Sequence, residues 1–83
     1  MTLLIASDVD ILLDRLCTKL GFCLPPKARL ELRANPPEDA TVFTDAVFLA
    51  EGLDPEMADR HLYRQVRDFV SIAFQTAQSR ETP

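Results

Sequence analysis

Apolar residues recur at helical spacing in the first part of the chain. Between residues 9 and 20 they recur at i, i+3, i+4, i+7, i+8 and i+11, at Val9, Leu12, Leu13, Leu16, Cys17 and Leu20. This spacing puts them on one face and predicts an amphipathic helix. Ser7 could cap its start with Asp10 in the capping-box position, and Gly21 is a typical helix end. An earlier start, capped by Thr2, would add Ile5 to the same face.

Two pairs of prolines set off a second, shorter helix. Pro25 and Pro26 give the chain a new direction, and the Asn35-Pro36-Pro37 run ends the segment. We predict a short helix over 27–34. Leu30, together with either Ala28 or Ala34, is expected to face inward.

A third helix is predicted from Asp39 to Glu51, with Gly52 after its last turn. Its apolar residues cover more than one face: Ala40, Val42, Phe43, Ala46, Val47, Phe48, Leu49 and Ala50. Such a helix is either central to the fold, or half of its surface meets a partner.

The fourth helix is predicted to begin at an Asp-Pro pair. Asp54 would cap it and Pro55 would take its first position. No Gly or Pro interrupts the chain before about Gln78, and we expect a frayed tail over 79–83. The predicted buried stripe comprises Ala58, Leu62, Val66, Phe69, Val70, Ala73 and Ala77.

No segment alternates apolar and polar residues as a half-buried strand does. The prediction is therefore an all-α protein, a compact bundle of three main helices plus one short helix. The length of 83 residues is compatible with a single helical domain over 1–83.

Composition narrows the setting in which the chain works. Its longest apolar runs are far shorter than the roughly 20 residues that cross a membrane, and the start lacks the pattern of a signal peptide. We therefore expect no membrane contact and a cytoplasmic location, in which Cys17 and Cys23 stay reduced as small buried residues. Their spacing permits a disulfide, which that compartment disfavours.

The residue types that carry catalysis are scarce. His61 is the only histidine, and the two cysteines lack the CxxC spacing of zinc and redox motifs. With glycine only at positions 21 and 52, there is no phosphate-binding loop. We predict a protein that is not an enzyme and uses no cofactor or metal, with His61 as an ordinary boundary residue.

Charge is uneven along the chain, although the net value is only −4. Residues 36–59 contain seven acidic residues and no basic one. One interpretation places Glu38, Asp39, Asp54 and Glu56 in the first turns of helices, where the helix dipole favours them. The other is an acidic face for a basic partner, as in an adaptor, antitoxin or immunity protein, with Glu51, Glu56 and Asp59 as its candidates.

Three arginines share one face of the predicted fourth helix: Arg60, Arg64 and Arg67. They could form a solvated face with Glu56–Arg60 and Arg64–Asp68 ion pairs. They could instead bind an anion or nucleic acid, because residues 42–70 can be drawn as a weak helix-turn-helix. The negative net charge disfavours nucleic acid, since phosphate attraction supplies most non-specific affinity for DNA.

Large apolar residues exceed what one buried stripe per helix requires. The excess comprises Phe22, Leu24, Phe48, Leu49, Ile72 and Phe74. The leading hypothesis is therefore a small helical interaction module that binds another protein or itself. We predict a homodimer built on the third and fourth helices, with Phe48, Leu49 and Phe74 as candidate interface residues.

Overall fold

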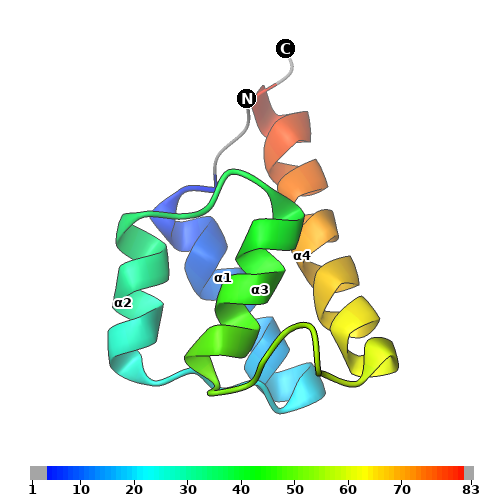
Figure 1. Ribbon diagram of the computed structural model, residues 1–83. Helices are drawn as coiled ribbons and strands as arrows, with labels where there is room; N and C mark the ends of the chain where they lie inside the picture. Colours follow the sequence, from blue (N-terminus) through cyan, green and yellow to red (C-terminus); the bar gives the residue numbers. More distant parts are fainter. Residues whose placement is uncertain (1–3, 82–83) are drawn as a thin grey trace.

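Four helices make up the part of the chain that the structure describes, and it contains no strand. The computed structural model describes residues 4–81, with side-chain exposure for 4–79. The helices are α1 (Ala6–Leu20), α2 (Pro26–Ala34), α3 (Ala40–Ala50) and α4 (Arg60–Glu81) (Figure 1). The predicted all-α architecture is confirmed.

Helix α1 begins one turn later than the earlier of its two predicted starts. Ile5 is its N-cap residue, and the Asp8 carboxylate accepts the Ile5 backbone N–H at 3.3 Å. Ser7 therefore lies inside the first turn, and Thr2 is outside the described residues. The helix ends as predicted at Gly21, whose φ of 77° is the left-handed conformation that glycine adopts without strain. Val9, Leu12, Leu13 and Leu16 of the predicted stripe are buried, whereas Cys17 and Leu20 are half-buried.

Helix α2 buries a different leucine from the one predicted. Leu30 is 61% exposed, whereas Leu32 is buried and Ala28 is half-buried. Residues two apart point to nearly opposite sides of a helix, so α2 can bury only one of these leucines. It packs mainly on α1, where Arg29 pairs with Asp14 at 2.8 Å.

Helix α3 packs mainly on α4. Asp39 caps it, accepting the Val42 N–H at 3.1 Å, and Gly52 follows its end with a φ of 77°. Phe43, Thr44, Val47 and Phe48 are buried. Val42 and Leu49, on the rest of the helix surface, are 54% and 63% exposed, so both interpretations of its broad apolar surface stay open.

The predicted start of α4 is wrong by one turn and a half. Asp54 accepts the Glu56 N–H at 2.9 Å, but this contact closes a turn and does not begin a helix. Asp59 accepts the N–H groups of His61 at 2.8 Å and Leu62 at 3.1 Å, so the helix begins at Arg60. Asp54 and Asp59 are both suitable N-cap residues, and Asp59 is the one that caps α4. The backbone stays helical to Glu81, past the predicted end.

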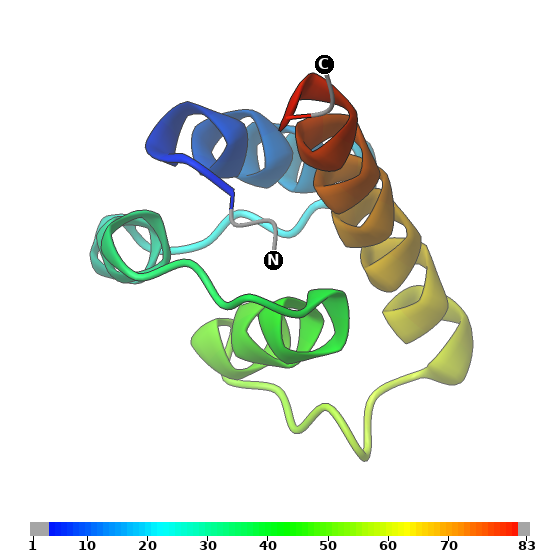
Figure 2. The same cartoon turned by 90° about the horizontal axis from the view of Figure 1, so that it is seen from above.

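The helices pack into one core, in which α4 contacts both α1 and α3 (Figure 2). The largest fully buried side chains come from α1, α3 and α4 and from Leu4, which lies just before α1. The radius of gyration of 12.0 Å matches the roughly 12 Å of a compact domain of this length.

A disulfide joins Cys17 to Cys23, so the prediction of reduced, buried cysteines is wrong. Gly21 turns the chain back at the end of α1 and brings the two Cα atoms to 4.3 Å. Cys23 is exposed and Cys17 is half-buried. Disulfides persist in oxidising environments, and the cytoplasmic location from which reduced cysteines were inferred stays a prediction. No helix among residues 4–81 is long and apolar enough to cross a membrane.

Candidate interaction surfaces

The predicted interface trio is divided between core and surface. Phe48 is fully buried, with its ring centroid 5.0 Å from that of Phe22 and 5.3 Å from that of Tyr63. A side chain without exposed area cannot form a docking surface, so its assignment to an interface is corrected to the core. Phe74 is half-buried and meets Phe43 edge to face at 6.3 Å. Leu49 alone is well exposed, at 63%.

Tyr63 connects the aromatic cluster to the acidic segment. Its hydroxyl donates a hydrogen bond of 2.7 Å to Asp45, which ties α4 to α3. Burial raises the pKa of Tyr63, and the hydrogen bond and charge of Asp45 raise it further. Arg67 and Arg60 lower this pKa in part. The pair acts as a structural clasp between two helices.

The three arginines of the predicted anion face are exposed on the first half of α4. Arg60 lies 5.0 Å from the centroid of the Tyr63 ring and donates to the carbonyls of Pro55 and Ala58. These contacts occupy Arg60 in place of the predicted pair with Glu56. Arg64 and Arg67 lie on the same helix as exposed cations.

The connection between α3 and α4 differs from a tight helix-turn-helix. Nine residues, 51–59, separate Ala50 from Arg60. The DNA-binding motif has a turn of about 3–4 residues, which sets the angle of its second helix. The connection between α3 and α4 is therefore longer than the turn of that motif.

The predicted acidic face consists of residues of that same loop. The Asp59 carboxylate accepts the backbone N–H groups of Leu62 and His61, and these contacts lower the pKa of Asp59. Glu51 is half-buried, and its Oε1 atom is buried without a hydrogen-bond partner. Glu56 is exposed. Asp39, Asp54 and Asp59 all accept backbone N–H groups, so much of the acidic run serves local structure.

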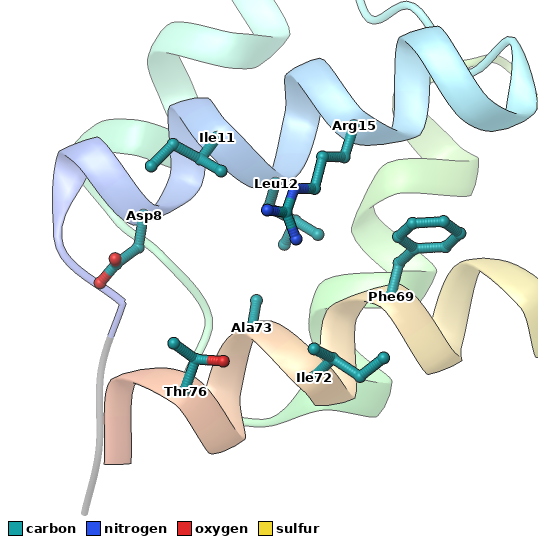
Figure 3. Close-up of a pocket in the computed structure, with 8 residues that line it drawn as sticks. All are labelled: Asp8, Ile11, Leu12, Arg15, Phe69, Ile72, Ala73 and Thr76. Carbon is teal, nitrogen blue, oxygen red and sulfur yellow. The ribbon is translucent and has the colours of Figure 1, made fainter. Parts of the chain in front are cut away.

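A groove runs between α1 and α4 on another side of the molecule (Figure 3). Its volume is about 130 Å³. Buried Leu12 forms its floor, and Ile11 and Ile72, each 54% exposed, stand at its mouth. The remaining lining residues are Asp8, Arg15, Phe69, Ala73 and Thr76.

Sequence reasoning missed this groove as a site. The sequence analysis counted Ile72 among the excess apolar residues but did not assign it to a surface with any other residue. Ile11 was a further signal, because it is a large apolar residue outside the stripe of α1. Only the packing of α4 on α1 shows that these two isoleucines share one surface.

A second apolar groove, of about 430 Å³, separates α2 from α3. Leu49 of α3, Glu31 of α2 and Asn35, the C-cap residue of α2, are among its lining residues. Its other lining residues are Ala28, Leu32, Ala46 and Ala50.

Residues 4–81 contain no cluster of three or more His, Cys, Asp or Glu side chains that could hold a metal ion. His61 is exposed at the start of α4. Comparisons with protein-family models, curated proteins and solved structures find no match to this chain.

Proposed function

We propose that the chain is a small helical protein-interaction module that associates with a second copy of itself. The observation that carries this proposal is the α1–α4 groove, where two isoleucines keep 54% of their surface in water above an apolar floor. Covering such a surface is favourable by roughly 25 cal/mol per Å² of apolar area removed from water.

The proposal includes no catalysis. The reason is that the sequence contains few of the residue types that carry catalysis: it has one histidine and two cysteines. The two cysteines are bonded to each other. The DNA-binding alternative gains no support from the nine-residue connection before α4. The basic-partner alternative retains Glu56, while Asp59 is used as a helix cap.

Sedimentation equilibrium on the full chain tests self-association. We expect a mass that rises from monomer toward dimer as the protein concentration increases through the micromolar range. A mixed DNA duplex at low salt should not change the sedimenting species. A monomer at high micromolar concentration would contradict the proposal, and a DNA-dependent shift would favour the arginine face.

A further inference from the structure

We infer that the α1–α4 groove is a two-fold homodimer interface, held in register by reciprocal Asp8–Arg15 ion pairs between the two copies. The inference rests on the proposed self-association and adds which surface is used and in what orientation. Asp8, Ile11 and Arg15 all line the groove from α1 (Figure 3).

The positions of the two charges fit a second copy of this chain. Asp8 and Arg15 are two turns apart on one face of α1, about 10 Å along its axis. If two α1 helices lie antiparallel, with the axis midway between residues 11 and 12, Asp8 of each faces Arg15 of the partner subunit. A two-fold interface repeats each contact, so one pairing supplies two ion pairs.

The Asp8 carboxylate can accept both its local and its proposed partners. Its Oδ2 atom accepts the Ile5 N–H at the start of α1. A carboxylate offers about four acceptor sites, so it can bind a guanidinium of the partner subunit in addition to contacts within its own chain. Arg15 is exposed and extends along the groove beside Leu12 (Figure 3).

The apolar residues fall between these charges. Ile11 lies near the proposed axis, and Ile72 faces it from α4 across the groove. Antiparallel α1 helices would cover both isoleucines of each copy. This arrangement puts apolar contacts at the centre and charges at the rim, as in typical protein interfaces.

Overall charge also favours this surface. The groove lining contains one acidic and one basic residue, so it is neutral although the whole chain has a net charge of −4. The acidic 51–59 loop lies on the opposite side of the molecule from α1 (Figure 2). Two copies joined at the groove therefore keep their acidic loops apart and avoid like-charge repulsion.

Charge reversal on the full chain tests this pairing. Asp8→Arg alone and Arg15→Asp alone should each weaken the dimer at least about tenfold, because each places like charges opposite one another. Mixing the two variants should restore association as a heterodimer, since every rim contact then joins Arg to Asp. Sedimentation of each variant and of the equimolar mixture measures this.

Matched variants separate the interface from general effects. Glu31→Lys reverses a charge at the α2–α3 groove, and Leu30→Ser replaces a leucine of α2 that is 61% exposed; neither should change dimerisation. Because Asp8 also contacts the α1 N-terminus, Ile72→Asp gives a second test that leaves that contact intact, and it should abolish the dimer. Circular dichroism confirms that each variant is folded.

The outcomes distinguish this interface from the proposed function. A dimer that survives Arg15→Asp and Ile72→Asp unchanged would overturn the groove assignment while leaving self-association in place. Variants that fail to reassociate on mixing, while Ile72→Asp dissociates the dimer, would overturn the antiparallel pairing. A wild-type chain that stays monomeric would overturn both the interface and the proposed function.

Discussion

At the scale of single residues, Tyr63 makes both apolar and charged contacts. Its ring packs against Phe48, its hydroxyl donates to Asp45, and Arg60 lies against its face. It is the only tyrosine in the chain, so its ionisation can be followed without interference.

We predict that Tyr63 titrates above its usual pKa of about 10 in the folded protein. The folded state then holds the proton longer than the unfolded state. The resulting stabilisation is complete below about pH 10 and is lost as the pH rises through the folded pKa. Ultraviolet absorbance of the ionised ring, in buffer and in denaturant, measures the two pKa values.

Asp45→Asn is the control for this titration. It removes the carboxylate charge, so the folded pKa should fall, but it should stay raised because burial is the largest cause. Equal pKa values for the wild type in buffer and in denaturant would contradict the Tyr63–Asp45 clasp.

Asp59 determines where α4 begins. Its pKa is lowered by the backbone N–H groups of Leu62 and His61, so the folded state favours the carboxylate. The stabilisation is present above the unfolded pKa of about 3.9 and is lost as the pH falls through the folded pKa. Asp59→Ala should lower the melting temperature at pH 7, and Asp59→Asn, which can still cap, should lower it less.

The same variants test the boundary of α4. If Asp59→Ala melts like the wild type while Asp54→Ala is strongly destabilised, the cap is at Asp54 and the helix begins there. The sequence alone could not decide between them, because each aspartate precedes a stretch compatible with a helix. Gly21 was predictable as the end of α1 because a glycine directly follows its apolar stripe.

At the scale of elements, the faces of α3 decide which residues are core. Phe48 and Leu49 are neighbours in sequence, but one is fully buried and the other is 63% exposed. The sequence could not tell which of the two is buried, because apolar residues occupy most of α3 and no 3.6-residue periodicity marks one face. The position of Tyr63 on α4, opposite Phe48, settles the difference.

We predict that Phe48→Ala lowers the free energy of unfolding by about 3–5 kcal/mol, through lost burial and a cavity. Leu49→Ala should change it by less than about 0.5 kcal/mol. Urea denaturation measures both, and Phe48→Leu gives a milder loss if the alanine variant does not fold. A Phe48→Ala variant of normal stability that fails to dimerise would return Phe48 to the interface.

The Cys17–Cys23 disulfide holds the end of α1 to the segment that follows it. Closing so short a loop contributes about 2 kcal/mol through the entropy of the unfolded chain. The double variant Cys17→Ser, Cys23→Ser should lose roughly this amount in urea denaturation.

Thiol labelling is the control for the disulfide. The purified wild type, unfolded without a reductant, should take up no alkylating reagent and should take up two equivalents after reduction. Labelling of both cysteines before reduction would contradict the bond. The prediction of reduced thiols followed from the expected cytoplasmic location. In the structure, the turn at Gly21 brings the two cysteines together.

At the scale of the whole molecule, the exposed apolar surface is a property of packing between helices. The sequence predicted the all-α class and most of the buried stripe, because both follow from local periodicity. It predicted an interface on the third and fourth helices, whereas the groove with two exposed isoleucines lies between α1 and α4. Contacts between helices depend on residues far apart in the sequence, and the apolar periodicity within one helix does not predict them.

Amide NMR spectra recorded over a dilution series test the proposed self-association most directly. Between about 1 mM and about 10 µM, which covers weak dimers, amide shifts should move together along one dimerisation curve. The largest changes should fall on residues 8–15 of α1 and 69–76 of α4, and they should grow smaller at high salt. Spectra that do not change with concentration, or changes centred on α2 and Leu49, would contradict the α1–α4 interface.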